Sequence, residues 1–147
     1  MKILIATDGS KFSKAAVEKG CQIIGNSKNV FIKIISATAT PFVAAEPFAV
    51  SADYYRELEG ELMKDAKKSV EEAEAQIREC LPEADVATQV FVGQPDQTIV
   101  EEAQNWGADL IIVGSHGYGF WSRALLGSVS NAVINHAPCS VLVVRGS

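Results

Sequence analysis

Residues 113–130 read VGSHGYGFWSRALLGSVS, a stretch that joins two elements of different kinds. It follows Leu110–Val113, whose continuous apolar side chains indicate a buried strand, and leads into Val129–Ile134, which indicates a short helix. Glycines here let backbone N–H groups approach a ligand, and the helix N-terminus adds unpaired N–H donors with partial positive charge. The stretch therefore predicts an anion-binding cradle, with a purely architectural turn as the alternative. Its glycines are Gly114, Gly117, Gly119 and Gly127, four of the eleven in the chain.

The charge distribution around this stretch also favours an anion. No Asp or Glu follows Asp109, whereas two arginines and both histidines of the chain do. Two familiar nucleotide-binding motifs are excluded. No Gly-x4-Gly-Lys-Ser/Thr occurs, and Ser122 stands where a third glycine after Gly117 and Gly119 would complete the dinucleotide fingerprint.

Length and composition predict one globular domain over residues 1–147. The chain is 48% hydrophobic and 21% charged, which is typical of a protein with a single packed core. We expect a cytoplasmic protein, because the apolar runs are too short for a membrane span or a secretory signal. Cys21, Cys80 and Cys139 are widely spaced without a Cys-x2-Cys pair, which favours reduced, mostly buried thiols over a disulfide or a zinc site.

The net charge of −5 is concentrated in the middle of the chain. Residues 53–85 contain eleven acidic and five basic side chains. An acidic segment of this size argues against non-specific nucleic-acid binding, although it does not argue against a nucleotide ligand.

The N-terminal segment places a carboxylate between a strand and a helix. Ile3–Ala6 is a continuous apolar run, typical of a strand covered on both faces in a parallel sheet. Thr7-Asp8-Gly9-Ser10 follows, and Ser10 or Ser13 can cap the next helix. Asp8 therefore stands where ligand-contacting side chains of open α/β sheets collect, with a role as a capping carboxylate as its alternative.

The remaining segments alternate between strand and helix patterns. Tyr54–Leu81 predicts a long amphipathic helix with a solvated charged face, and Thr38–Ala52 predicts a loop near the ligand site. Such alternation predicts an α/β fold with an open, parallel five-stranded sheet. Ligands of these sheets bind outside the carboxyl ends of the strands, where both Asp8 and Gly114 lie. The other expected elements are strands at Val30–Ala37, Val86–Val92, Asp109–Val113 and Ser140–Val144, and helices at Ala16–Ile24, Pro95–Trp106 and up to His136.

Gly114-Ser-His-Gly117, nine residues and then Gly127-Ser128 form the pattern Gly-x2-Gly-x9-Gly-Ser. This resembles the signature of the ATP-binding branch of the universal stress protein family. Residues 3–13, ILIATDGSKFS, resemble the family's first strand and its Asp-Gly-Ser turn. Gly93-Gln-Pro95, Asp109–Gly114 and His136–Val144 resemble the entry of its third helix and its fourth and fifth strands. The resemblance covers nearly the whole chain, and only Thr38–Ala52 and the acidic helix lack a distinctive match.

The resemblance implies a Rossmann-like sheet of strand order 3-2-1-4-5 with helices on both faces. It also implies a bound ATP, or another adenine nucleotide, with Mg²⁺. Main-chain groups near Ala6 and Ala37 would meet the adenine, and Asp8 would lie near the ribose and the metal. The phosphates would lie along two separated halves of the cradle, which are Gly114, Ser115, His116, Gly117 and Tyr118, then Gly127, Ser128, Val129 and Ser130. Hydroxyls of Ser128 and Ser130 can donate further hydrogen bonds there.

One part of the cradle departs from the family pattern. A small basic or polar sequence commonly follows the second glycine in the family, whereas here Tyr118, Phe120 and Trp121 place three aromatic rings in four residues. These rings could cover a nucleotide, form a patch for a partner, or pack against the neighbouring helix. Arg123 is a candidate for the missing positive charge.

We expect a regulatory ATP-binding protein of the stress response with no catalytic residues and, at most, slow ATP hydrolysis. His116 could meet a phosphate, but a general-base role is disfavoured because the sequence shows no nucleophile activated by it. The alternatives are a nucleotide-free dimeric interaction module and an ATP-consuming phosphotransferase or adenylyltransferase. The resemblance also implies a homodimer through Val141–Val144, and the sequence does not identify a further protein partner.

Overall fold

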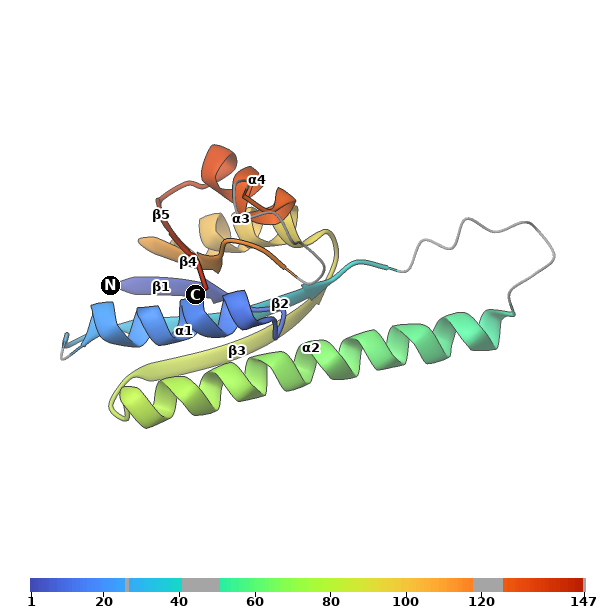
Figure 1. Cartoon of the computed structure of the whole chain (residues 1–147), viewed down its shortest axis with the longest axis horizontal. Helices are drawn as coiled ribbons and strands as arrows, with labels where there is room; N and C mark the ends of the chain where they lie inside the picture. Colours follow the sequence, from blue (N-terminus) through green and yellow to red (C-terminus); the bar gives the residue numbers. More distant parts are fainter. Residues whose placement is uncertain (26, 41–50, 118–125, 147) are drawn as a thin grey trace.

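Five parallel strands form one sheet in the order β3-β2-β1-β4-β5, as the family resemblance implies (Figure 1). The computed structural model describes residues 1–25, 27–40, 51–117 and 126–146. Strands and helices alternate along the chain, which confirms the α/β fold and the open sheet. The elements are β1 (Lys2–Ala6), α1 (Lys11–Ile24), β2 (Phe31–Thr38), α2 (Ala52–Cys80), β3 (Asp85–Val92), α3 (Pro95–Trp106), β4 (Leu110–Gly114), α4 (Ser128–His136) and β5 (Ser140–Val144).

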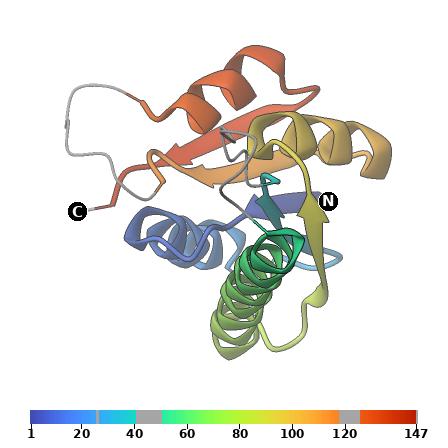
Figure 2. The same ribbon diagram turned by 90° about the vertical axis from the view of Figure 1, so that its right-hand side faces the viewer.

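The sheet is covered on both faces, with α1 and α2 on one side and α3 and α4 on the other (Figure 2). Side chains of β1 alternate between the two resulting cores, because successive residues of a strand point to opposite faces. Ile3 and Ile5 belong to the core under α1 and α2, whereas Leu4 belongs to the core under α3 and α4. All three side chains are fully buried. The continuous apolar run of this strand therefore reflects burial on both faces.

Helix ends follow the local sequence signals. Ser10 caps α1, since its hydroxyl accepts a hydrogen bond from the Ser13 amide at 3.3 Å, so of the two candidate caps Ser10 takes that role. Pro95 opens α3, where its missing N–H costs nothing. Gly107 follows α3 with a φ of 71°, a left-handed conformation that glycine adopts without steric penalty. His136 is the last residue of α4, as expected for a side chain that complements the helix dipole.

The long helix α2 has 29 residues and only part of it packs on the sheet. Its buried side chains lie between Ala66 and Ile77, and Figure 1 shows the earlier turns extending past the strands. The solvated charged face is confirmed, because Glu74 and Arg78 pair at 2.7 Å across one helical turn. Most of the predicted loop before α2, residues 41–50, lies outside the described residues. Within the described part of the chain, no helix has the length and apolarity to cross a membrane.

The prediction of three reduced cysteines is wrong for two of them. Cys21 in α1 and Cys80 at the end of α2 form a disulfide, with their Cα atoms 6.1 Å apart, while Cys139 is a free thiol. The two cysteines are 59 residues apart in the sequence. They meet because α1 and α2 lie side by side on one face of the sheet, a tertiary relationship that cysteine spacing does not reveal.

Candidate functional site

A cavity of about 260 Å³ opens where β1, β2 and β4 end. Such a position is the usual ligand site of an open α/β sheet. The cavity brings together ten of the twelve residues predicted for the site, although they come from four separate parts of the chain. These ten are Ala6, Asp8, Ala37, Gly114, His116, Gly117, Gly127, Ser128, Val129 and Ser130.

The other two predicted residues do not line the described cavity. Ser115 is only 1% exposed and supports the cradle from behind. Tyr118 lies outside the described residues, as do Phe120, Trp121 and Arg123, so the three roles considered for the aromatic rings stay open.

One side of the cavity is the free edge of a strand. The Thr7 amide donates to the Ile35 carbonyl at 2.9 Å, and after this bond the chain of β1 turns away while β2 continues beside β3 to Thr38. Backbone groups along a strand alternate in direction, so those of Ala37 face the same side as those of Ile35. The N–H and C=O of Ala37 therefore point toward the cavity, where they can pair with the edge of a planar heterocycle.

The opposite side of the cavity is the N-terminus of α4. Gly127 is the N-cap residue, and no side chain supplies a capping hydrogen bond there. The first-turn N–H groups, which have no partner within a helix, include those of the cavity-lining residues Ser128, Val129 and Ser130. They carry the partial positive charge of the helix end, so this side suits a phosphate.

Two serines join the halves of the cradle. The Ser130 hydroxyl donates to the Ser115 carbonyl oxygen at 2.9 Å, and the Gly127 amide donates to the same oxygen at 2.8 Å. The Ser115 amide in turn donates to the Val144 carbonyl of β5 at 2.8 Å. Ser130 is only 2% exposed, so its hydroxyl positions the cradle, whereas the exposed Ser128 hydroxyl is available to a ligand.

Close backbone approaches explain why glycines occupy this region. A Cβ on Gly114 would lie 2.7 Å from the Phe12 carbonyl carbon, which means that β4 runs directly against the start of α1. A Cβ on Gly127 would lie 3.1 Å from the Ser115 carbonyl oxygen and so press on the other half of the cradle. Gly114 and Gly127 thus stand at two close backbone contacts where a side chain would not fit without a shift.

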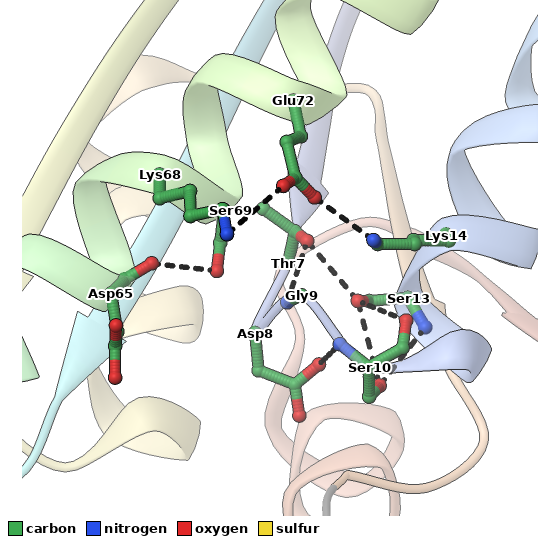
Figure 3. Close-up of polar contacts among 10 residues, drawn as sticks. All are labelled: Thr7, Asp8, Gly9, Ser10, Ser13, Lys14, Asp65, Lys68, Ser69 and Glu72. Atoms are coloured by element: carbon green, nitrogen blue, oxygen red, sulfur yellow. Dashed lines mark hydrogen bonds and ion pairs between the residues drawn. The ribbon is translucent and has the colours of Figure 1, made fainter.

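The Asp8 carboxylate stabilises the turn before α1 and also lines the cavity, while its role toward a ligand stays a prediction. One carboxylate oxygen, Oδ1, accepts a hydrogen bond from the Ser10 amide at 2.9 Å and stabilises the turn into α1 (Figure 3). The other, Oδ2, lies 2.9 Å from where a Cβ on Gly117 would stand, next to the glycine cradle. Among the described residues that line the cavity, Asp8 is the only carboxylate.

A hydroxyl network fixes the turn that carries Asp8. The buried Thr7 hydroxyl donates to Ser13 Oγ at 3.1 Å and accepts from the Gly9 amide at 3.2 Å, and Ser13 Oγ donates to the Ser10 carbonyl at 3.0 Å (Figure 3). Beside it, Lys14 pairs with Glu72 of α2 at 2.9 Å. This hydrogen bond, and then the charge of Lys14, hold the pKa of the Glu72 carboxyl below its ordinary value. The turn is therefore held by hydrogen bonds from several sides.

His116 lines the cavity next to a serine hydroxyl. Its Nδ1 lies 3.0 Å from Ser115 Oγ, and its ring lies 5.2 Å from the Phe12 ring, centroid to centroid. A hydroxyl beside an imidazole is a pattern of nucleophilic catalysis, but Ser115 is 1% exposed and does not line the cavity. His116 can therefore contact a ligand without activating this serine toward it.

Six further residues line the cavity. The polar pair Thr7 and Ser13 belongs to the polar cluster after the first strand, so that cluster could have identified them. The apolar residues form a wall from β2, α3 and β4, and apolar core positions carry no local signal for a ligand. These four are Ile35, Pro95, Ile99 and Val113.

The donor set fits Mg²⁺ only as a companion of phosphate. No group of three His, Cys, Asp or Glu side chains that could hold a metal occurs within the described ranges. Mg²⁺ commonly keeps several waters and binds through one or two carboxylates plus substrate phosphates. A nucleotide that brought Mg²⁺ would find one carboxylate in the described lining of the cavity, that of Asp8.

Comparison with known proteins gives the family. The model of the universal stress protein family matches residues 1–145. The universal stress protein Sll1388 of Synechocystis is 31% identical over 98% of this chain and 97% of its own length. The solved structure of the hypothetical protein MJ0577 has a TM-score of 0.81 at 27% identity and covers 99% of this chain and 96% of its own.

A further solved structure, a universal stress protein in complex with cAMP, is 30% identical with a TM-score of 0.69. It covers 100% of this chain and 98% of its own. The sheet order, the family match and these likenesses agree along nearly the whole length of the chain. This chain belongs to the universal stress protein family.

Proposed function

We propose that this chain binds ATP, or another adenine nucleotide, together with Mg²⁺ in the cavity at the ends of β1, β2 and β4. The observation that carries the proposal is the pairing of two chemically different sides in one cavity. The backbone of Ala37 offers a donor and an acceptor to the edge of a base, and the cradle from Gly114 to Gly117 with the start of α4 offers N–H groups to phosphate. The cAMP complex of a 30% identical relative supports the adenine part.

In this proposal the protein acts as a nucleotide-dependent regulator in a stress response and not as a dedicated enzyme. Its cavity combines one carboxylate with glycine backbone and apolar walls, which is suited to holding a nucleotide. The Ser115 hydroxyl, the one beside His116, is buried and does not line the cavity. This lining favours binding a nucleotide over rapid hydrolysis of it.

The proposal extends to assembly and location. β5 is the last strand of the sheet, and its Val141–Val144 side chains are only half-buried. An apolar edge of this kind is usually covered or paired, which supports a homodimer through β5. We propose that residues 1–147 work as one nucleotide-binding domain within such a dimer, in the cytoplasm.

A glycine substitution tests the placement of the nucleotide. Gly127→Val would put a branched side chain 3.1 Å from the Ser115 carbonyl oxygen, within the cradle. Calorimetric titration with ATP and Mg²⁺ should show at least about a tenfold loss of affinity, roughly 1.4 kcal/mol. Gly60→Ala is the control, because nothing lies within 4 Å of a Cβ at that position in α2. Unchanged affinity in a folded Gly127→Val protein would refute this placement.

A further inference from the structure

The disulfide between Cys21 and Cys80 lies outside the cavity and has no part in the proposed nucleotide binding. Cys21 lies in the last turn of α1, half-buried against the core that α1 and α2 share. Cys80 is the last residue of α2 and is exposed to solvent. The two cysteines therefore differ in exposure, and access is one of the factors that decide which sulfur reacts first in an exchange reaction.

The helix ends around the two sulfurs influence their chemistry. Both lie in the C-terminal turn of a helix, where the partial negative charge of the carbonyl groups opposes a thiolate. The uncharged disulfide is therefore favoured at this place over a charged thiolate. Exchange should consequently be slow at neutral pH and faster as the pH rises.

The third cysteine is a weak competitor for the same reagent. Cys139 is half-buried in the turn before β5. Burial, and then the Asp109 carboxylate, raise the pKa of the Cys139 thiol. A small-molecule oxidant should accordingly meet Cys80 first, because it is the most exposed of the three cysteines.

We propose that Cys21 and Cys80 form a reversible thiol–disulfide exchange site for small-molecule disulfides such as glutathione disulfide. In the reduced protein, the Cys80 thiolate attacks one sulfur of glutathione disulfide, forming a mixed disulfide and releasing one glutathione. The Cys21 thiolate then attacks the Cys80 sulfur and releases the second glutathione. Two electrons pass from the protein to glutathione disulfide, and the two thiol protons leave with the two glutathione molecules. Excess reduced glutathione reverses both steps.

The oxidised and reduced forms should differ in how firmly α2 is held against α1. A second polar connection between these helices is the ion pair of Lys14 with Glu72, whose side chains are 54% and 42% exposed. Exposed pairs of this kind contribute little to stability. The disulfide fixes the far end of α2, immediately before the edge strand β3. Ile77 and Leu81 still pack this end of α2 on the core, so reduction should loosen the exposed backbone around Cys80 and the start of β3 without releasing the helix.

Mass spectrometry of the full chain tests the order of the reaction. Reduced protein freed of reductant and treated with glutathione disulfide should form the bond between Cys21 and Cys80 within one chain. Cys21→Ser should trap one glutathione on Cys80, whereas in Cys80→Ser the modification of Cys21 should be at least about tenfold slower because of its burial. Cys139→Ser is the matched control and should behave like the wild type. Trapping on Cys21 in preference to Cys80, or a disulfide between two chains, would overturn the proposal.

Hydrogen exchange of the wild-type protein provides a readout that needs no substitution. Amides of residues 76–86 should exchange at least about tenfold faster in the reduced form, while those of β4 and α3 keep their rates. Equal rates in the two forms would show that the bond does not hold α2, and failure of dithiothreitol to reduce it without denaturant would show that it is not an exchange site. Either result would overturn the proposal.

Discussion

The Ser130 hydroxyl lies 2.9 Å from the Ser115 carbonyl oxygen and thereby joins two segments that are separated by 15 residues. Ser130→Ala should lower the free energy of unfolding by about 1 kcal/mol, because the Ser115 carbonyl keeps its second hydrogen bond, from Gly127. Nucleotide affinity should also fall, since the cradle loses a support. Denaturant unfolding and calorimetry measure the two effects.

The Ser128 hydroxyl should have the opposite balance of effects on binding and stability. Ser128 is exposed at the cavity, so Ser128→Ala should weaken nucleotide binding while the free energy of unfolding stays within about 0.5 kcal/mol of the wild type. A larger stability loss in Ser128→Ala than in Ser130→Ala would mean that the two serines have been given the wrong roles.

Gly114 should be the least replaceable glycine of the cradle. An added Cβ would stand 2.7 Å from the backbone of α1, and the backbone must shift to admit it. Gly114→Ala should cost about 1–3 kcal/mol of unfolding free energy. Gly60→Ala, in an open position of α2, should instead add about 0.5–1 kcal/mol through helix propensity. Thermal and denaturant unfolding of both variants would expose an error if the two shifts had the same sign.

Asp8→Asn distinguishes a role of Asp8 in binding Mg²⁺ from its role in the turn before α1. The asparagine carbonyl can still accept from the Ser10 amide, so the turn into α1 should persist. A neutral side chain is a much poorer Mg²⁺ ligand, and ATP affinity measured with Mg²⁺ should fall about tenfold or more. Titrations in EDTA should show little difference between variant and wild type. Asp53→Asn, at the exposed start of α2, is the charge-matched control. An Asp8→Asn protein with a normal Mg²⁺ response would exclude Asp8 from the metal site.

Glu72 should show the pH dependence of its ion pair. The Lys14 ammonium lowers the pKa of this carboxyl below the ordinary 4.5. The pair therefore contributes its small stabilisation above pH 4.5 and loses it as the pH falls through the lowered pKa. An NMR titration should find the pKa of Glu72 raised by Lys14→Met. An unchanged titration would mean that the pair does not persist in solution.

Removing one backbone N–H from β5 tests the proposed dimer. The Val144 carbonyl accepts from Ser115 of the cradle, so alternation along the strand turns the N–H of Val143 outward. Val143→Pro removes that donor and blocks further strand pairing without breaking the bonds to β4. Sedimentation should show a dimer for the wild type at tens of micromolar and a monomer for Val143→Pro.

The opposite edge of the sheet supplies a control for this experiment. Thr88 in the middle of β3 has an outward N–H by the same alternation, because the Gly93 amide donates to Thr38 of β2. Thr88→Pro should remain a dimer. Dissociation by Thr88→Pro, or a monomeric wild type, would contradict assembly through β5.

Most of the fold could be predicted from the sequence because its signals are local. Each of these signals depends only on residues nearby in the sequence. Examples are the buried strand at Ile3–Ala6, the capping residue Ser10 and the glycine after α3. Strand order came from the family resemblance, since alternation alone does not determine which strands are neighbours.

The candidate site was predictable where polar or glycine residues follow a strand. The apolar wall at Ile35 and Ile99 was not, because side chains that line a ligand cavity and side chains that fill a core have the same chemistry. The Cys21–Cys80 bond was also missed, since it depends on how two distant helices pack. The inward role of Ser115 depends on backbone contacts across the cradle, which no spacing pattern shows.

Calorimetric titration of the wild-type protein with ATP in the presence of Mg²⁺ is the most direct test of the central claim. We expect saturable binding of one nucleotide per chain below millimolar concentration. GTP should bind at least about tenfold more weakly, because its base presents a different hydrogen-bonding edge to the backbone of Ala37. No saturable binding at millimolar ATP would contradict the account.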